Sequence, residues 1–196
     1  VEKWRLLFGY ADGMSYGVVS ASNYKATFFD GECAVIATDI PAEEQGTGML
    51  FNMDGEVVGM ISSSVWNDTG KNVVNAYGIS DLKPIIELLI NGKSVPYIGI
   101  YGTTVTEQLA EEHKMPSGIY VADVDPDSPA MAAGIQIGDI ICEASGEEIK
   151  DIAAYQNIVI GSSVGETMEF VGKRLGSDGY VNIKFSVVTT EKEEVK

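Results

Sequence analysis

The stretch Leu50-Phe51-Asn52-Met53-Asp54-Gly55-Glu56-Val57-Val58-Gly59 predicts a β-hairpin. An apolar run leads into Asp54-Gly55, and a second strand returns from Glu56 to Ile61. Two strand-like runs joined by Asp-Gly are the strongest short-range indication of a hairpin with a two-residue turn. Residues 1 to about 80 contain further short apolar runs with glycine-rich turns between them, which favours a barrel or a sandwich of strands.

A helix is predicted directly after this β-rich region. Asp81 is a suitable N-cap, apolar residues recur at helical spacing as far as Ile90, and Asn91-Gly92 ends the pattern. We place a domain boundary at the end of this helix, after residue 92. Residues 93–190 form a second unit, and residues 191–196 form a charged tail.

The second unit alternates strands with short helices. A capping box at Thr104 and Glu107 predicts one helix, and Ser128-Pro129 predicts another that ends before Gly134. Asp151 caps a third helix, which stops at Gly161. The clean alternation of apolar residues from Val181 to Val187 predicts a final strand with one buried face.

The opening hairpin resembles part of the trypsin-like serine proteases, above all the HtrA branch. In that family a Gly-Asn-Ser-Gly-Gly-Pro-Leu loop runs into a strand, a turn with Asp-Gly or Asn-Gly, and a strand that ends in Gly-Ile. The resemblance covers only the second of the two barrels of the protease domain. It therefore implies that residues 1–92 are a degenerate C-terminal half-barrel, without the first barrel that carries the family's histidine and aspartate.

Two further motifs resemble the PDZ domain of bacterial HtrA proteases. The stretch from Asp127 to Ile141 contains Ser-Pro-Ala and Gly-Asp-Ile-Ile at the family's spacing, and Tyr97-Ile98-Gly99-Ile100 is similar to the family's carboxylate-binding loop. Both occur in family order after the hairpin. The fold class implied is mainly β with α: the second half of a trypsin-like β-barrel domain, followed by a PDZ domain over residues 93–190.

The resemblance does not extend to the catalytic chemistry. Counting back from Leu50 places the nucleophile on Gly46, whereas counting forward from Thr38-Asp39 places it on Thr47, and Gly48 completes the loop. A serine nucleophile needs a histidine base that is oriented by an acid. Neither position is serine, and the chain's one histidine, His113, falls at a helix end in the second unit. We therefore expect no catalytic residues and no enzyme activity.

The resemblance implies a peptide-binding groove in the second unit. A PDZ groove adds a ligand strand to an open sheet edge and receives the ligand's C-terminal carboxylate on backbone N–H groups. Four residues would supply the edge and the donors, and four at helical spacing would supply the opposite wall or pack the core. The first set is Tyr97, Ile98, Gly99 and Ile100, and the second is Ile152, Tyr155, Gln156 and Val159.

Composition narrows the range of partners. The chain has 29 acidic and 13 basic residues and a net charge of -16, so nucleic acids and anionic lipids are poor partners. No apolar run approaches the roughly 20 residues of a membrane span, and we expect neither membrane insertion nor a signal peptide. Cys33 and Cys142 form no disulfide framework, and no Cys or His pair has ligand spacing, so no metal or cofactor is expected.

The favoured function is therefore that of a non-catalytic HtrA-like protein that binds peptides or protein C-terminal tails. One alternative is a serine endopeptidase of protein quality control whose first barrel is missing from this chain. The other is a structural module that assembles with an envelope partner. Residues 1–80 lack the first barrel that would cover them, which predicts self-association or a missing subunit. The resemblance also implies an extracytoplasmic location in bacteria.

Overall fold

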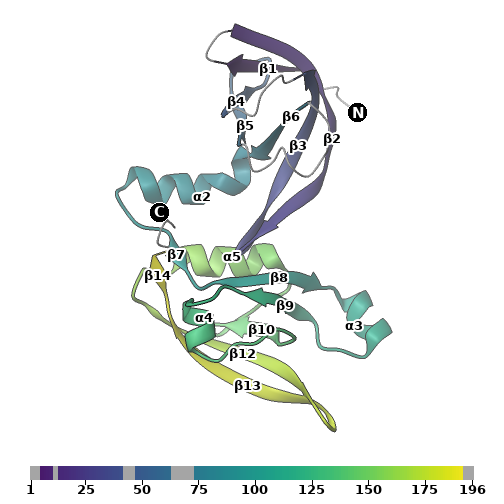
Figure 1. The fold of residues 1–196 in the computed structure, drawn as a ribbon, viewed down its shortest axis with the longest axis vertical. Coiled ribbons are helices and arrows are strands. Elements are labelled where there is room, and N and C mark those ends of the chain that lie inside the picture. The colour runs from purple at the N-terminus through teal and green to yellow at the C-terminus, as the bar shows by residue number, and fades with distance from the viewer. Residues whose placement is uncertain (1–4, 11–12, 42–46, 63–72, 192–196) are drawn as a thin grey trace. The chain divides into compact units, whose positions relative to one another are not determined.

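The computed structural model describes residues 5–10, 13–41, 47–62 and 73–191, and the chain divides into two compact units (Figure 1). Unit 1 contains residues 1–26 and 33–86, and unit 2 contains residues 27–32 and 87–196. The structure is mainly β with α, with a barrel sheet followed by a second sheet, in agreement with the expected fold class.

Unit 1 is a barrel that closes in the strand order β1-β2-β3-β6-β5-β4. Side chains of β3 alternate between buried and partly buried along the strand, as expected where one face covers a core. The core cluster contains Ile40, Leu50, Ile61, Val74 and Ala76. The strands are β1 (Arg5–Tyr10), β2 (Gly13–Phe28), β3 (Gly31–Pro41), β4 (Gly48–Phe51), β5 (Val57–Ile61) and β6 (Val73–Gly78).

The predicted hairpin is formed by β4 and β5, but its loop is longer than expected. Asn52 N–H donates to the Glu56 carbonyl at 2.9 Å, so three residues rather than two form the loop. The Asn52 side-chain oxygen accepts from the N–H groups of Asp54 and Glu56, and Gly55 has φ of +80°. Asp-Gly therefore closes a three-residue loop with a bulge, because the Asn52 amide stabilises that alternative.

Helix α2 (Ile79–Ile90) begins two residues before the predicted N-cap. Asp81 lies in its first turn, and one carboxylate oxygen accepts from the Ala34 N–H at 2.7 Å instead of capping the helix. Burial, together with this carboxylate, raises the pKa of the neighbouring Cys33 thiol to about 12. Cys33 is thus a buried thiol on β3, whereas Cys142 in unit 2 is only partly buried.

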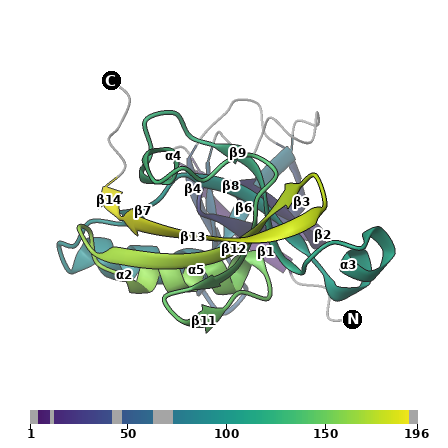
Figure 2. The same cartoon turned by 90° about the horizontal axis from the view of Figure 1, so that it is seen from below.

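Unit 2 is built on a sheet with the strand order β13-β12-β10-β9-β8 (Figures 1 and 2). A separate pair, β14 with β7, joins the two ends of the unit through Thr190 and Tyr97. The strands are β7 (Pro96–Tyr97), β8 (Ile100–Val105), β9 (Gly118–Val124), β10 (Ile140–Ala144), β11 (Glu147–Glu148), β12 (Thr167–Gly176), β13 (Gly179–Val188) and β14 (Thr190–Glu191). The helices are α3 (Glu107–His113), α4 (Pro129–Ala132) and α5 (Ile152–Gly161).

Two of the three helix caps in unit 2 are as predicted. Ser128 caps α4 and Asp151 caps α5, each through its side-chain oxygen. The predicted capping box at Thr104 is wrong, because Thr106 caps α3 and Thr104 lies on β8. The Thr104 hydroxyl instead accepts from the Ile152 N–H at 3.0 Å, which ties the start of α5 to β8.

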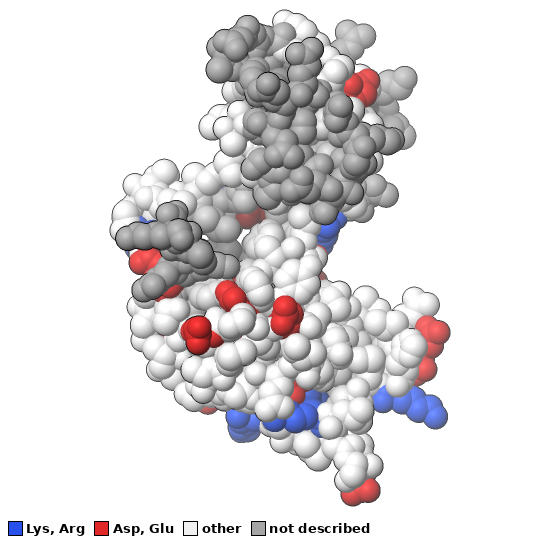
Figure 3. All heavy atoms as spheres, viewed as in Figure 1, with Lys and Arg blue, Asp and Glu red and all other residues white. Residues whose placement is uncertain are grey.

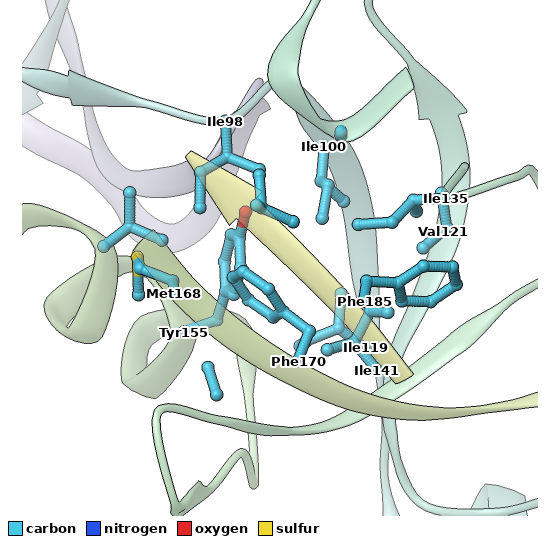
Figure 4. Packing of buried hydrophobic residues seen from close by; sticks show 14 of the residues in the cluster. Ile98, Ile100, Ile119, Val121, Ile135, Ile141, Tyr155, Met168, Phe170 and Phe185 are labelled. Carbon is cyan, nitrogen blue, oxygen red and sulfur yellow. The ribbon is translucent and has the colours of Figure 1, made fainter. Parts of the chain in front are cut away.

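The core of unit 2 lies between α5 and the sheet (Figure 4). Tyr155 and Phe170 are both fully buried at its centre, with ring centroids 6.4 Å apart. Ile98 before β8, Ile119 on β9 and Ile141 on β10 extend the cluster. This packing fixes the buried face of α5 against the segment that precedes β8.

Figure 3 shows acidic and basic side chains interspersed over the described surface of unit 2 on the face drawn. Within the described ranges, no helix is both long and apolar enough to cross a membrane. No three His, Cys, Asp or Glu side chains of the described part of the chain gather closely enough to hold a metal ion.

Candidate carboxylate-binding site

The loop between β7 and β8 is held by its carbonyl groups. The Ile98 carbonyl accepts from the Ala130 N–H at 3.0 Å, and the Gly99 carbonyl accepts from the Asp125 N–H at 2.9 Å. Tyr97 adds a third link to the same region, since its hydroxyl donates to the Asp125 carboxylate. With its carbonyls anchored on and beside α4, the loop presents its N–H groups on another side.

Gly99 is the residue that permits this geometry. Its backbone φ is +94°, a value that residues with a side chain rarely adopt. A Cβ at this position would lie 2.4 Å from the Cβ of Ser128. Ser128 is the N-cap of α4 and is itself buried, so it has little freedom to move away. A glycine is therefore required for the loop to approach α4 so closely.

The N–H groups of this loop converge on one carboxylate, that of Asp30. Ile98 and Gly99 each donate to Oδ2 at 2.7 Å, and Ile100 donates to Oδ1 at 3.0 Å. The Tyr155 hydroxyl adds a fourth donor to Oδ1, at 2.6 Å. These four bonds lie within unit 2, because residues 27–32 belong to it. The loop thus binds a carboxylate. In other proteins, too, consecutive backbone N–H groups in a concave turn bind anions.

Burial dominates the electrostatics of this site. Asp30 is only 8% exposed, and burial raises its pKa, while the four hydrogen bonds oppose the rise. Burial and the nearby Asp30 raise the pKa of Tyr155 as well, so its phenol stays protonated and remains a donor. A carboxylate enters such a buried place only when donors replace the water that it loses.

The structure brings Ile98, Gly99, Ile100 and one predicted helix residue, Tyr155, to the same carboxylate. The fourth predicted loop residue, Tyr97, bonds Asp125 instead. All four predicted residues of α5 are buried. Ile152, Tyr155 and Val159 are members of the core cluster, and the Gln156 side-chain oxygen accepts from the Glu32 N–H at 3.1 Å. The sequence did not point to Asp30 as a site residue. Asp30-Gly31 is recognisable as a turn, but the loop that binds its carboxylate lies about 70 residues further along the chain.

Two other features lie near these elements. Strand β8 ends the sheet order of the described strands, so its outer edge borders the site. A pocket of about 500 Å³ lies over a different side of α5, lined by Ala154, Asn157 and Ile158 and by three glutamates. None of the predicted groove residues lines that pocket. We place the candidate site at the carboxylate because its donors are specific in direction and number.

Of the residues named for the nucleophile loop and its base, the structure describes Thr47, Gly48 and His113. Thr47 is exposed just before β4, and Gly48 opens that strand. Gly46 lies outside the described residues. His113 is exposed in the last turn of α3, in the other unit.

Known proteins match the sequence of both units. Residues 120–174 match a family described as "PDZ domain". A probable periplasmic serine endoprotease DegP-like of Halomonas elongata is 30% identical over 183 residues, which is 90% of this chain and 38% of that protein. The serine protease Do-like HtrA of Bacillus subtilis is 30% identical over 174 residues, 82% of this chain and 38% of that protein. The chain thus spans about two fifths of the length of these relatives.

Solved structures give the same picture of the fold. The HtrA-type protease AlgW with decapeptide has a TM-score of 0.61 at 19% identity, covering 98% of this chain and 61% of that one. The serine endoprotease from Yersinia pestis has a TM-score of 0.57 at 22% identity, and the match covers 98% of this chain and 63% of that one. With part of a protease barrel domain in unit 1 and a PDZ domain in unit 2, the chain belongs to the HtrA/DegP-type serine protease family.

Proposed function

We propose that this chain binds the C-termini of proteins or peptides at the loop between β7 and β8, and that it does so without hydrolysing them. The observation that carries the proposal is the convergence of the Ile98, Gly99 and Ile100 N–H groups and the Tyr155 hydroxyl on one carboxylate. A C-terminal carboxylate offers the same two oxygens. The PDZ match and the peptide complexes of AlgW agree with such a role.

The ligand would add a strand along β8. Its last N–H would donate to the Ile100 carbonyl, and its carboxylate would lie on the loop donors. The proposed wall of Ile152, Tyr155, Gln156 and Val159 is largely apolar, so an apolar C-terminal residue is favoured. A single added strand buries an area at the low end of specific interfaces, which corresponds to roughly micromolar affinity.

Two further aspects of the proposal concern the wider protein. The DegP-like relatives are named as periplasmic, which supports an extracytoplasmic location. Met49 and Met60 are paired across β4 and β5 and are 50% and 39% exposed, with Tyr16 on β2 at 68%. We propose the outer face of these strands as the surface for self-association or for a missing subunit.

Titration of the full chain with a library of peptides that end in apolar residues tests the binding. We expect the amide resonances of Ile98 to Tyr101 to shift with roughly micromolar affinity. Amidation of the peptide C-terminus should weaken binding about 100-fold or more, because it removes the charge from several hydrogen bonds. Shifts that survive amidation, or that centre on α4, would place the peptide elsewhere.

We also expect the chain to be hydrolytically inert. Loss of serine and histidine from a Ser-His-Asp triad removes about 10⁶ in kcat, and neither Gly46 nor Thr47 restores a nucleophile with a base. Incubation with casein and with fluorogenic peptides should give no turnover, and fluorophosphonate probes should give no adduct. Stoichiometric labelling at Thr47 that is lost in Thr47→Ala would show that the site is active.

A further inference from the structure

We infer that the segment Thr27–Glu32 is a built-in ligand of the carboxylate-binding loop, and that external C-termini bind only by displacing it. The inference rests on the proposed function, since it concerns the regulation of the same site. The starting point is that the Ile98, Gly99 and Ile100 donors are already occupied by the Asp30 carboxylate. Two carboxylates cannot accept from the same three N–H groups.

Asp30 presents the two groups that a C-terminal residue would present. Its carboxylate lies on the loop N–H groups, and its own N–H donates to the Ile100 carbonyl at 2.7 Å. A terminal residue also carries an N–H and a carboxylate, attached to one Cα. In Asp30 the carboxylate is one carbon further away, and the backbone φ of +62° accommodates the difference. That conformation is uncommon outside glycine, although aspartate tolerates it better than most residues.

The rest of the segment contacts both sides of the proposed groove. The Phe29 ring packs edge-on against Tyr101 of β8, with centroids 5.8 Å apart. On the α5 side, Gln156 accepts from the Glu32 N–H. Gly31 lies so close to Gln156 that a Cβ there would come within 2.6 Å of its Cδ. The segment therefore lies between β8 and α5, as a bound peptide would.

An internal ligand competes at high effective concentration, because it is tethered to its site. The apparent affinity for an external ligand falls in proportion to the fraction of molecules in which the site is open. If the segment occupies the loop nine times in ten or more, removing its carboxylate should tighten external binding about tenfold or more.

The test compares the wild-type chain of residues 1–196 with Asp30→Ala by fluorescence polarisation, using one labelled free-acid peptide with an apolar C-terminus. We expect Asp30→Ala to bind it about tenfold or more tightly. Asp178→Ala is the matched control, because Asp178 is an exposed aspartate of the same unit, in the β12–β13 turn, and should leave the affinity unchanged. Gly31→Ala keeps the carboxylate but crowds Gln156, and it should also tighten binding.

The outcomes separate the two proposals. If wild type, Asp30→Ala and Gly31→Ala bind the peptide equally, the internal ligand is refuted and the proposed function stands. If none of them binds any free-acid peptide of the library, the proposed function itself is refuted. If Asp30→Ala does not fold, as judged by circular dichroism, Gly31→Ala decides the question by the same criterion.

Discussion

Arg174→Leu is expected to lower the free energy of unfolding of unit 2 by about 3 kcal/mol. The Arg174 guanidinium donates to both oxygens of Asp139, at 2.6 and 2.7 Å, and to the Gly134 carbonyl at 3.0 Å. Asp139 is fully buried, whereas the Arg174 side chain is 33% exposed. Removing the arginine leaves a buried carboxylate without its charged partner, and the exposure of Arg174 sets the loss at the lower end of the range.

Hydrogen exchange of the β10 amides measures this loss for unit 2 alone. Lys173→Leu is the matched control, since it removes the same charge from the adjacent position of β12 and should change the free energy by less than about 0.5 kcal/mol. The double variant Asp139→Asn, Arg174→Leu should recover part of the loss, because the buried group is then neutral. Equal exchange in wild type and Arg174→Leu would show that Asp139 is satisfied without the arginine.

Gly99→Ala is expected to abolish carboxylate binding and to cost roughly 3 kcal/mol of stability. The new Cβ would lie 2.4 Å from Ser128 Cβ, and alanine is strained at φ of +94°. The loop must then move from α4, and its three N–H groups lose their common direction. We expect no measurable binding of free-acid peptides, and altered amide resonances at Ile98 and Ile100.

The same substitution in α5 is the control for Gly99→Ala. Gly161 is the last residue of that helix, and a Cβ there meets no atom within 4 Å. Gly161→Ala should therefore be neutral or slightly stabilising, and should bind peptides as the wild type does. A Gly99→Ala chain that binds with wild-type affinity would show that the loop geometry does not depend on glycine.

Local sequence patterns predicted much of unit 2. The caps at Ser128 and Asp151 were correct because each bond joins residues three apart, so the pattern and the contact are both local. Where a distant element competes, the local pattern failed. Thr104 fits a capping box for α3, but its hydroxyl accepts from the first N–H of α5 instead. Asp81 fits an N-cap, but its carboxylate accepts from the Ala34 N–H instead.

The candidate site shows the same division. Tyr97-Ile98-Gly99-Ile100 could be named as a candidate from its resemblance to the carboxylate-binding loop of the family. Asp30 could not be identified, since a single Asp-Gly turn is common and nothing in its neighbourhood points to a loop about 70 residues away. Tyr155 could not be predicted as the fourth donor for the same reason, since its hydroxyl donates to Asp30.

The central claim is that the loop receives a carboxylate, from Asp30 or from a ligand, and ¹H–¹⁵N spectra of the chain with Asp30→Ala test it most directly. We expect the Ile98, Gly99 and Ile100 amide protons to move upfield relative to wild type, because their charged acceptor is gone. A free-acid peptide with an apolar C-terminus should return them downfield, and its amidated form should not. Unchanged amide shifts in Asp30→Ala, or the same response to both peptides, would contradict the claim.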